Sequence, residues 1–435
     1  MAHNPPLRTD RLVPRFAVST PAQAAWLVSR YLVATPVLWL LGLLTIAGAA
    51  LVLWLTAARG PDDRRIGLLA ALWLSVPAAQ ALAVIYNWAR LGEPSSMLVG
   101  HLASFPVVGW LFFSAALAAG QAWRLDSPKV VRGVMILGGS TLAFSALALG
   151  IAAATGLGQL EVTTPVRYLA GANPPPAVEF YATAVFYLGA EASFGLPRLV
   201  LFFPWSTALG FGGICIFFIA FCERQASWRW LGFVAGVVIV LLSFSRAAAV
   251  ILPICLLLFL LLRSGPGMRA TGILALAAAG LAMLVLDISP IALMHDMMSQ
   301  INASRAGSSQ ARDLIYAYSW QGFLDSPVFG QGWIGPSVIR QEVLPVGSHS
   351  TLYGTLYTGG VVTFAALVCA GTALAIVALR AALVLRSTEA AAAASIVAAF
   401  IAFGYGEGLY NLILPCLFAF LFVGSALSSR KEQPA

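Results

Sequence analysis

The sequence predicts an all-α polytopic membrane protein, and three features support this fold class. Hydrophobic residues make up 60% of the 435-residue chain, charged residues only 10%, and the mean hydropathy is +0.87. A soluble domain usually has about 25% charged residues, and a disordered chain is polar. Apolar runs of about 20 residues, the length that crosses a bilayer as a helix, recur along the whole chain. The composition therefore excludes an ordinary water-soluble enzyme.

Eleven apolar runs are candidate transmembrane helices, and an alternative reading gives twelve. The twelfth arises if residues 20–58 divide near Pro36, which places both chain termini on the same side of the membrane. We therefore expect 11–12 transmembrane helices. The eleven runs cover residues 33–57, 66–89, 97–121, 131–154, 199–221, 229–244, 247–262, 270–286, 352–379, 389–406 and 409–428.

Two longer polar stretches interrupt the apolar runs, at residues 155–198 and 287–351. No internal repeat is evident, so the chain is expected to form one helical domain with two substantial loops. The expected organisation is 1–154, N-terminal transmembrane helices; 155–198, a loop; 199–286, transmembrane helices; 287–351, a large loop; and 352–435, C-terminal transmembrane helices and a tail.

The distribution of basic residues predicts the orientation of these segments. Cytoplasmic loops carry an excess of Lys and Arg. If the short loops after the odd-numbered runs and the C-terminal tail are cytoplasmic, they hold 14 of the 25 basic residues, and the opposite side holds seven. Both long loops lie on the side with fewer basic residues. We therefore expect them to face the periplasm or exterior.

The net charge of +8 does not indicate nucleic-acid binding, because loops of membrane proteins collect arginines and no basic-aromatic motif is present. The five cysteines lie in or at the ends of apolar runs without a C-x-x-C pair, as expected for buried small hydrophobes. The expected external loops have no paired carboxylates or D-x-D, so no metal site and no cofactor are predicted.

Arg246 lies between two apolar runs of about 16 residues each, in the segment Ser243-Phe244-Ser245-Arg246. An arginine at membrane depth is costly unless it reaches water or an anion. Two readings are open: the side chain extends to the headgroups at a tight helical hairpin, or its guanidinium binds phosphate at the outer face.

The second long loop contains an expected amphipathic helix at residues 310–324. Leu314, Ile315, Tyr318 and Leu324 are expected on its apolar face. Arg312 stands in its first turn beside Asp313, and a solvated ion pair is the alternative to a functional role. Arg305 is a weaker candidate upstream of this helix.

The loop ends at Ser348-His349-Ser350-Thr351, so His349 is expected at the outer mouth of the next helix. An imidazole there could accept a proton from a sugar hydroxyl or donate a hydrogen bond to a phosphate, although lone histidines are more often structural. Glu407 lies between the last two apolar runs and could orient an arginine, bind a hydroxyl or simply form a turn.

These residues resemble the O-antigen ligase and polymerase superfamily of bacterial envelope glycosyltransferases. The ligase pattern H-[NSQ]-x9-G-x-x-[GTV] is matched by His349, Ser350, Gly360 and Thr363, and a Ser-Arg pair at a helix end by Ser245-Arg246. Arg312, Trp320, Pro327, Gly330 and Gly332 match an Arg, Trp, Pro-x-x-Gly-x-Gly order, and Glu407 a glutamate near the last helices. The resemblance covers about residues 195–425. A Pro-Asn pair of many members is not matched, since Arg198 and Pro204 are present but the asparagine is absent.

The resemblance implies a glycosyltransferase of the GT-C type in the bacterial inner membrane, with its active site facing the periplasm. It would transfer a glycan from an undecaprenyl diphosphate donor to an acceptor hydroxyl, in lipopolysaccharide or exopolysaccharide biosynthesis. His349, Arg246 and Arg312 would be catalytic, and Arg198, Arg305, Glu407 and Ser350 would bind substrate. The arginines would replace a metal ion, so the enzyme would be metal-independent.

Two further choices stay open. A ligase would use a lipid A core sugar as acceptor, and a polymerase would use a second carrier-linked glycan. The alternative function is a transporter or a flippase for lipid-linked glycans. Such proteins usually have related halves and ionisable residues near the bilayer midplane, which this sequence lacks apart from His101.

Overall fold

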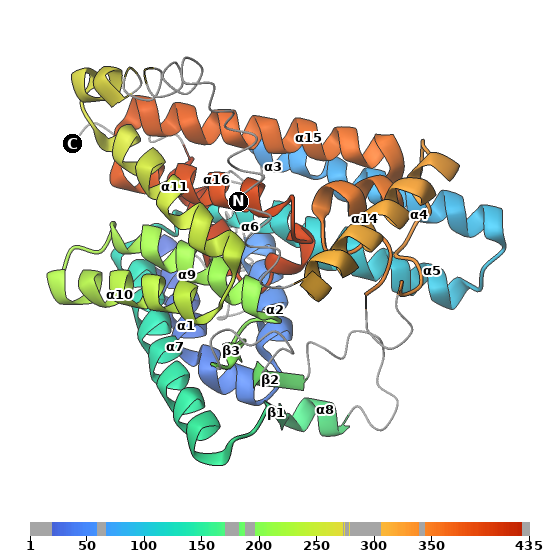
Figure 1. The fold of residues 1–435 in the computed structure, drawn as a ribbon. Coiled ribbons are helices and arrows are strands. Elements are labelled where there is room, and N and C mark those ends of the chain that lie inside the picture. Colours follow the sequence, from blue (N-terminus) through green and yellow to red (C-terminus); the bar gives the residue numbers. More distant parts are fainter. Residues whose placement is uncertain are drawn as a thin grey trace, which may run out of the picture.

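The computed structural model describes residues 20–58, 67–169, 182–187, 196–272, 274, 278, 306–338 and 344–428 (Figure 1). Most of these residues are helical, as predicted. The helices are α1 (Pro21–Leu40), α2 (Leu44–Ala57), α3 (Leu68–Trp73), α4 (Ser75–Leu91), α5 (Ser95–Leu102), η2 (Ala103–Leu111), α6 (Phe112–Trp123), α7 (Pro128–Thr155), α8 (Pro165–Leu169), α9 (Ser206–Ala220), α10 (Ala226–Leu242), α11 (Arg246–Arg263), α14 (Ala306–Asp325), α15 (Thr351–Leu385), α16 (Thr388–Phe403), η4 (Leu409–Leu412) and α17 (Leu417–Ala426).

Within the described residues, five helical segments are long and apolar enough to cross a membrane. They are Leu68–Leu91, Ser95–Trp123, Pro128–Thr155, Arg246–Arg263 and Thr351–Leu385. Five shorter apolar helices, α2, α9, α10, α16 and α17, pack among them. Most of the predicted run 270–286 lies outside the described residues.

The predicted first span is two helices. Pro36 lies inside α1, and the chain breaks instead at Leu41–Leu43, between α1 and α2. The expected division near Pro36 is therefore wrong in position. Proline at a helix interior removes one hydrogen bond but does not force the chain to reverse, whereas Gly42, with a φ of 74°, ends α1 in a turn.

Two other predicted spans differ in form. The run 97–121 contains a nine-residue π-helix, η2, around Pro106, whose missing N–H disrupts regular α-helical bonding. The run 409–428 is not one helix but a 3₁₀ turn, η4, followed by the ten-residue α17.

The all-α expectation misses a small sheet in the first long loop. Strands β1 (Gln159–Thr163), β2 (Ala182–Tyr187) and β3 (Arg198–Leu199) form an antiparallel sheet in the order β1-β2-β3. Residues of β1 alternate between exposed and partly buried, as in a half-covered strand. An alternation of five residues is too short to stand out beside long apolar runs.

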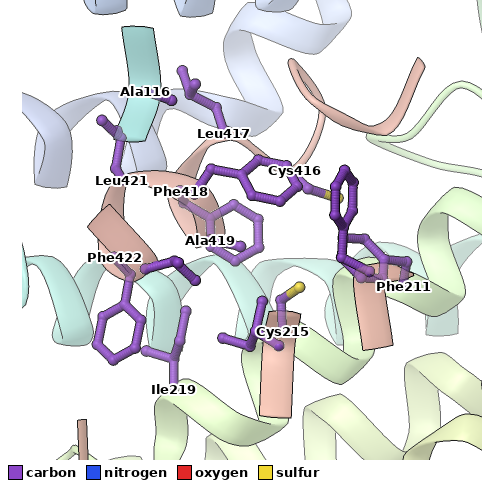
Figure 2. Close-up of a cluster of buried hydrophobic side chains, with 14 of the residues drawn as sticks. Ala116, Phe211, Cys215, Ile219, Cys416, Leu417, Phe418, Ala419, Leu421 and Phe422 are labelled. Atoms are coloured by element: carbon purple, nitrogen blue, oxygen red, sulfur yellow. The ribbon is translucent and has the colours of Figure 1, made fainter. Parts of the chain in front are cut away.

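Helix α9 lies at the centre of the packed core, and every one of its 15 residues is buried. It packs against α10, α16 and α7. Cys215 of α9 and Cys416 lie among apolar side chains, with Phe211 and Phe418 nearby (Figure 2). These two cysteines are buried free thiols, as the sequence predicted. Because α9 is packed on all sides, the residues at its two ends are held in fixed positions.

Candidate functional site

The segment Gly347–Ser350, which leads into α15, is held by hydrogen bonds from α14. The Ser319 hydroxyl accepts a bond from the Gly347 amide at 2.9 Å, and the Tyr316 hydroxyl donates to the His349 carbonyl at 3.2 Å. Ser350 caps α15 by accepting the Tyr353 amide at 3.4 Å. His349 has a φ of 60°, a conformation that costs about 1–3 kcal/mol and persists where its surroundings enforce it.

The His349 side chain is mostly shielded from water and lies near Arg312. Its Nδ1 atom is 2.6 Å from the Ser348 hydroxyl oxygen. Burial and, to a smaller extent, the positive charge of Arg312 together lower the pKa of the imidazole from 6.5 to about 4. The imidazole is therefore neutral at pH 7, and it can accept a proton.

Arg312 forms an ion pair with Glu407, which is distant from it in sequence. Its Nη2 atom lies 3.2 Å from Glu407 Oε1, and 35% of its side-chain surface stays exposed against 7% for the glutamate. Thr351 ties the start of α15 to the same turn, because its hydroxyl donates to the Glu407 carbonyl at 2.7 Å and its amide donates to the Gly404 carbonyl at 2.9 Å.

Glu407 also faces the first turn of α9. Burial raises the pKa of its carboxyl above the usual value, while Arg312, Thr207 and Trp205 act in the opposite direction. Beside Thr207, the Ser206 hydroxyl accepts a hydrogen bond from Arg198 Nη2 at 2.8 Å. The Arg198 guanidinium lies 5.4 Å from the ring centre of Tyr187. Arg198 and Glu407 are thus brought to the same end of α9.

Arg246 begins α11, and Ser245 caps this helix by accepting the Ala248 amide at 3.2 Å. The Ser-Arg junction packs against α9, where a Cβ atom built on Gly210 would lie 2.8 Å from both the Ser243 hydroxyl and the Ala248 methyl group. The start of α11, which carries Arg246, therefore lies beside the N-terminal half of α9.

The predicted helix is present as α14, but the four apolar residues do not share one face, because Ile315 is buried and the other three are exposed. The buried face carries Ile315 with the small residues Ala311 and Ser319. Leu314, Tyr318 and Leu324 are each at least 41% exposed, as is Trp320 at 46%. Small side chains allow α14 to approach α15 closely, and the larger apolar groups remain outward, as in a helix at a membrane interface.

A break in α15 was not expected from the sequence. Gly360 has φ 62° and ψ −165°, so the helical hydrogen bonds are interrupted there. The loop after α14 supplies the missing partners. The Gln331 and Gly332 amides donate to the Tyr357 and Thr358 carbonyls at 2.7 and 2.9 Å, and the Val361 amide donates to the Pro327 carbonyl at 2.8 Å. The Pro-x-x-Gly-x-Gly segment and Gly360 thus form one main-chain contact.

Two buried amide side chains of α4 hold this loop from the other side. Asn87 donates to the Gly330 carbonyl at 3.1 Å, and Gln80 donates to the Gly332 carbonyl at 3.5 Å. His101 of α5 stacks on Trp333 with ring centres 4.4 Å apart, which gives this histidine a structural partner. Gln80 and Asn87 are polar residues inside the apolar run 66–89, and this position could have marked them in the sequence as residues with polar partners.

The predicted residues divide into two groups by location. The structure brings Arg312, Glu407, His349 and Ser350 together, and it places Arg198 and Arg246 at the adjoining end of α9. Arg305 lies outside the described residues. Sequence reasoning missed Tyr316, Ser319 and Ser348, because hydroxyl groups that bond to backbone leave no sequence pattern.

The fold and site define a multi-pass helical membrane protein with arginine, histidine and glutamate side chains at one end of its helices. Residues 231–368 match the family model described as O-Antigen ligase. This match supports the O-antigen ligase and polymerase superfamily that the sequence resembles. Arg246, Arg312 and His349 lie inside the matched range, and Arg198 and Glu407 lie outside it. No curated protein matches the chain.

The match supports an enzyme that transfers glycans in polysaccharide and lipopolysaccharide biosynthesis, of the ligase or polymerase type.

Proposed function

We propose that the protein is an inner-membrane glycosyltransferase of the GT-C type whose active site faces the periplasm. It transfers a glycan from an undecaprenyl diphosphate carrier to the hydroxyl of an acceptor, either a lipid A core sugar or a second carrier-linked glycan. The observation that carries this proposal is the convergence of Arg312, Glu407 and His349 at the start of α15.

The ion pair leaves Arg312 able to bind an anion. A guanidinium has five N–H donors, and Glu407 takes one contact, from Nη2. The remaining donors and the partly exposed side chain suit bidentate contact with a phosphate. Arg246, at the start of α11, would bind the second phosphate, and the two arginines would stabilise the negative charge that develops on the leaving diphosphate.

His349 is better suited to be a general base than a cationic phosphate ligand. Burial and the charge of Arg312 both favour its neutral form. In the proposed reaction, the acceptor hydroxyl oxygen forms a bond to the anomeric carbon while the bond from that carbon to the diphosphate oxygen breaks. The hydroxyl proton passes to His349, which later releases it to solvent.

The reaction is proposed to need no metal ion. The described residues contain no group of three or more His, Cys, Asp or Glu side chains that could hold one. Charge stabilisation would therefore come from arginines. If transfer by the purified protein is lost in EDTA and restored by a divalent cation, this part of the proposal is wrong.

The central experiment uses the purified full-length protein in lipid vesicles with a lipid-linked glycan donor and an acceptor glycolipid. We expect His349→Ala and Arg312→Ala to lose about 100-fold or more in transfer rate, and Arg246→Ala a comparable amount. Arg132→Ala is the matched control, because Arg132 pairs with Glu223 near the opposite end of α9 and should leave transfer intact. Full activity of all three site variants would contradict the proposed site.

A flippase would give a different result in the same vesicles. It would move the lipid-linked glycan between leaflets without forming a glycosidic bond. A deletion strain then separates the two enzyme readings: retention of a single repeat indicates a polymerase, and accumulation of full-length carrier-linked chains indicates a ligase.

A further inference from the structure

The Ser348 hydroxyl lies between two partners that both make short contacts with it. Its oxygen is 2.5 Å from the Pro345 carbonyl oxygen and 2.6 Å from His349 Nδ1. A serine hydroxyl has one proton and two lone pairs, so it can donate only one of these bonds. The position of that single proton decides which nitrogen of His349 carries a hydrogen.

The contact with Pro345 requires the serine proton. Two oxygen atoms at 2.5 Å, the short limit for an O–H···O bond, repel each other unless a proton lies between them. A carbonyl oxygen has no proton to give. Ser348 therefore donates to Pro345, and its lone pair must accept a hydrogen bond from His349 Nδ1–H. The neutral imidazole then has no proton on Nε2.

We infer that Ser348 is a positioning residue that fixes the tautomer of His349 and leaves Nε2 as the proton acceptor of the site. The inference rests on the proposed function, in which His349 takes the proton of the acceptor hydroxyl. Which ring nitrogen acts is set by the hydrogen bond that the other nitrogen makes. In water a free imidazole exchanges between tautomers, whereas here one tautomer is selected before the substrate arrives.

The surrounding segment keeps Ser348 and His349 in this relation. Ser319 holds the amide of Gly347, and Tyr316 holds the carbonyl of His349, so the backbone on both sides of Ser348 is anchored to α14. The rings of Tyr316 and Tyr353 stack with centres 4.7 Å apart, which fixes Tyr316 against α15. Arg312 comes from the same helix as both anchors, so a single element sets the relative position of the proposed base and the proposed phosphate ligand.

The direct test is ¹⁵N NMR of the full-length protein labelled at histidine, with His349→Ala used to assign the resonances of His349. At neutral pH we expect a pyrrole-type shift for Nδ1 and a pyridine-type shift for Nε2. In Ser348→Ala, the Nδ1–H group loses its acceptor, and we expect the population to move toward the Nε2–H form. A pyridine-type Nδ1 in the unsubstituted protein would overturn the inference, whatever the variants do.

Kinetics provide a second, independent readout. We expect Ser348→Ala to lower kcat about tenfold with little change in the KM for the donor, and Ser348→Thr to restore most of the rate, since threonine keeps the hydroxyl. In a His349→Ala background, Ser348→Ala should have no further effect on the residual rate. An equal loss in both backgrounds would indicate a structural role and would contradict the inference.

The two proposals fail in different ways. If His349→Ala retains full transfer activity, the proposed role of His349 is wrong. If His349→Ala is inactive but Ser348→Ala is as active as the unsubstituted protein, the proposed function stands and only the role of Ser348 is wrong.

Discussion

Among the described residues, two arginine–glutamate pairs lie near opposite ends of α9. They differ in the contacts that each guanidinium makes. Arg132 contacts both oxygens of Glu223 at 2.9 Å, donates to Gln225 at 3.1 Å, and lies 4.8 Å from the ring centre of Trp228. Arg312 makes one contact with Glu407, at 3.2 Å. The two arginines are similarly exposed, at 33% and 35% of the side chain.

The difference indicates which pair stabilises the fold and which is available for a ligand. The hydrogen bond from Arg132 is the main cause that lowers the pKa of Glu223, so this carboxylate is well satisfied. Burial dominates at Glu407 and raises the pKa of its carboxyl, although Arg312, Thr207 and Trp205 act in the opposite direction. Among the described residues Arg312 makes one side-chain hydrogen bond, to a buried acid, and such an arginine suits a site whose contacts are completed when an anion binds.

Exchange of each arginine for lysine should have the largest effect and should separate the two pairs. We expect Arg312→Lys to lower transfer about 100-fold without unfolding the protein, because lysine keeps the charge but loses bidentate contact. Arg132→Lys should lower stability by about 1 kcal/mol and keep activity within about twofold. The measurements are transfer rate and thermal unfolding midpoint for both variants. Equal losses of activity would remove the distinction between the pairs.

Neutralising each glutamate should have an intermediate effect. Glu407→Gln keeps the shape but removes the charge that orients Arg312, and we expect about a tenfold loss of kcat/KM. The matched variant Glu223→Gln should leave kcat/KM unchanged and lower the unfolding free energy by about 1 kcal/mol. The same pair of assays checks both, and a stability loss confined to Glu407→Gln would reverse our assignment.

The pH dependence should give the smallest effect, confined to acid conditions. The pKa of His349 falls from 6.5 in the unfolded chain to about 4 in the folded protein, so the neutral base is present at pH 5 and above. We expect the His349-dependent rate to be flat above about pH 5 and to fall near pH 4. Because the unfolded state binds the proton more tightly, His349 contributes stability that is full above pH 6.5 and is lost as pH falls toward 4.

Rate–pH profiles in detergent-free vesicles, with the residual rate of His349→Ala subtracted, check this prediction. An acid limb near pH 6.5 would show that neither burial nor Arg312 controls the imidazole.

The sequence predicted a mostly helical membrane fold, and the structure brings Arg312, Glu407, His349 and Ser350, which the sequence singled out, close together. Apolar runs report helices because the bilayer requires about 20 apolar residues, and ionisable residues at their ends stand out by their rarity. The sheet β1-β2-β3, the buried face of α14 and the break at Gly360 were missed. Each of these depends on contacts with segments that are distant in sequence. Strand β2 pairs with β1, and α14 packs with its small residues buried. The 327–332 loop provides the hydrogen bonds that α15 lacks at Gly360.

The main-chain contact between the 327–332 loop and α15 changes how two family positions should be interpreted. A Cβ atom on Gly330 would clash with the Tyr357 carbonyl oxygen, and one on Gly360 would clash with the Val328 carbonyl oxygen. Each glycine therefore leaves room for the backbone of the opposite segment. A smaller residue at one position cannot make space for a side chain at the other, because the atoms in the way belong to the backbone. Among relatives that keep this contact, both positions should be invariant although neither touches substrate, so invariance there would record close packing and would be a poor guide to the reacting atoms.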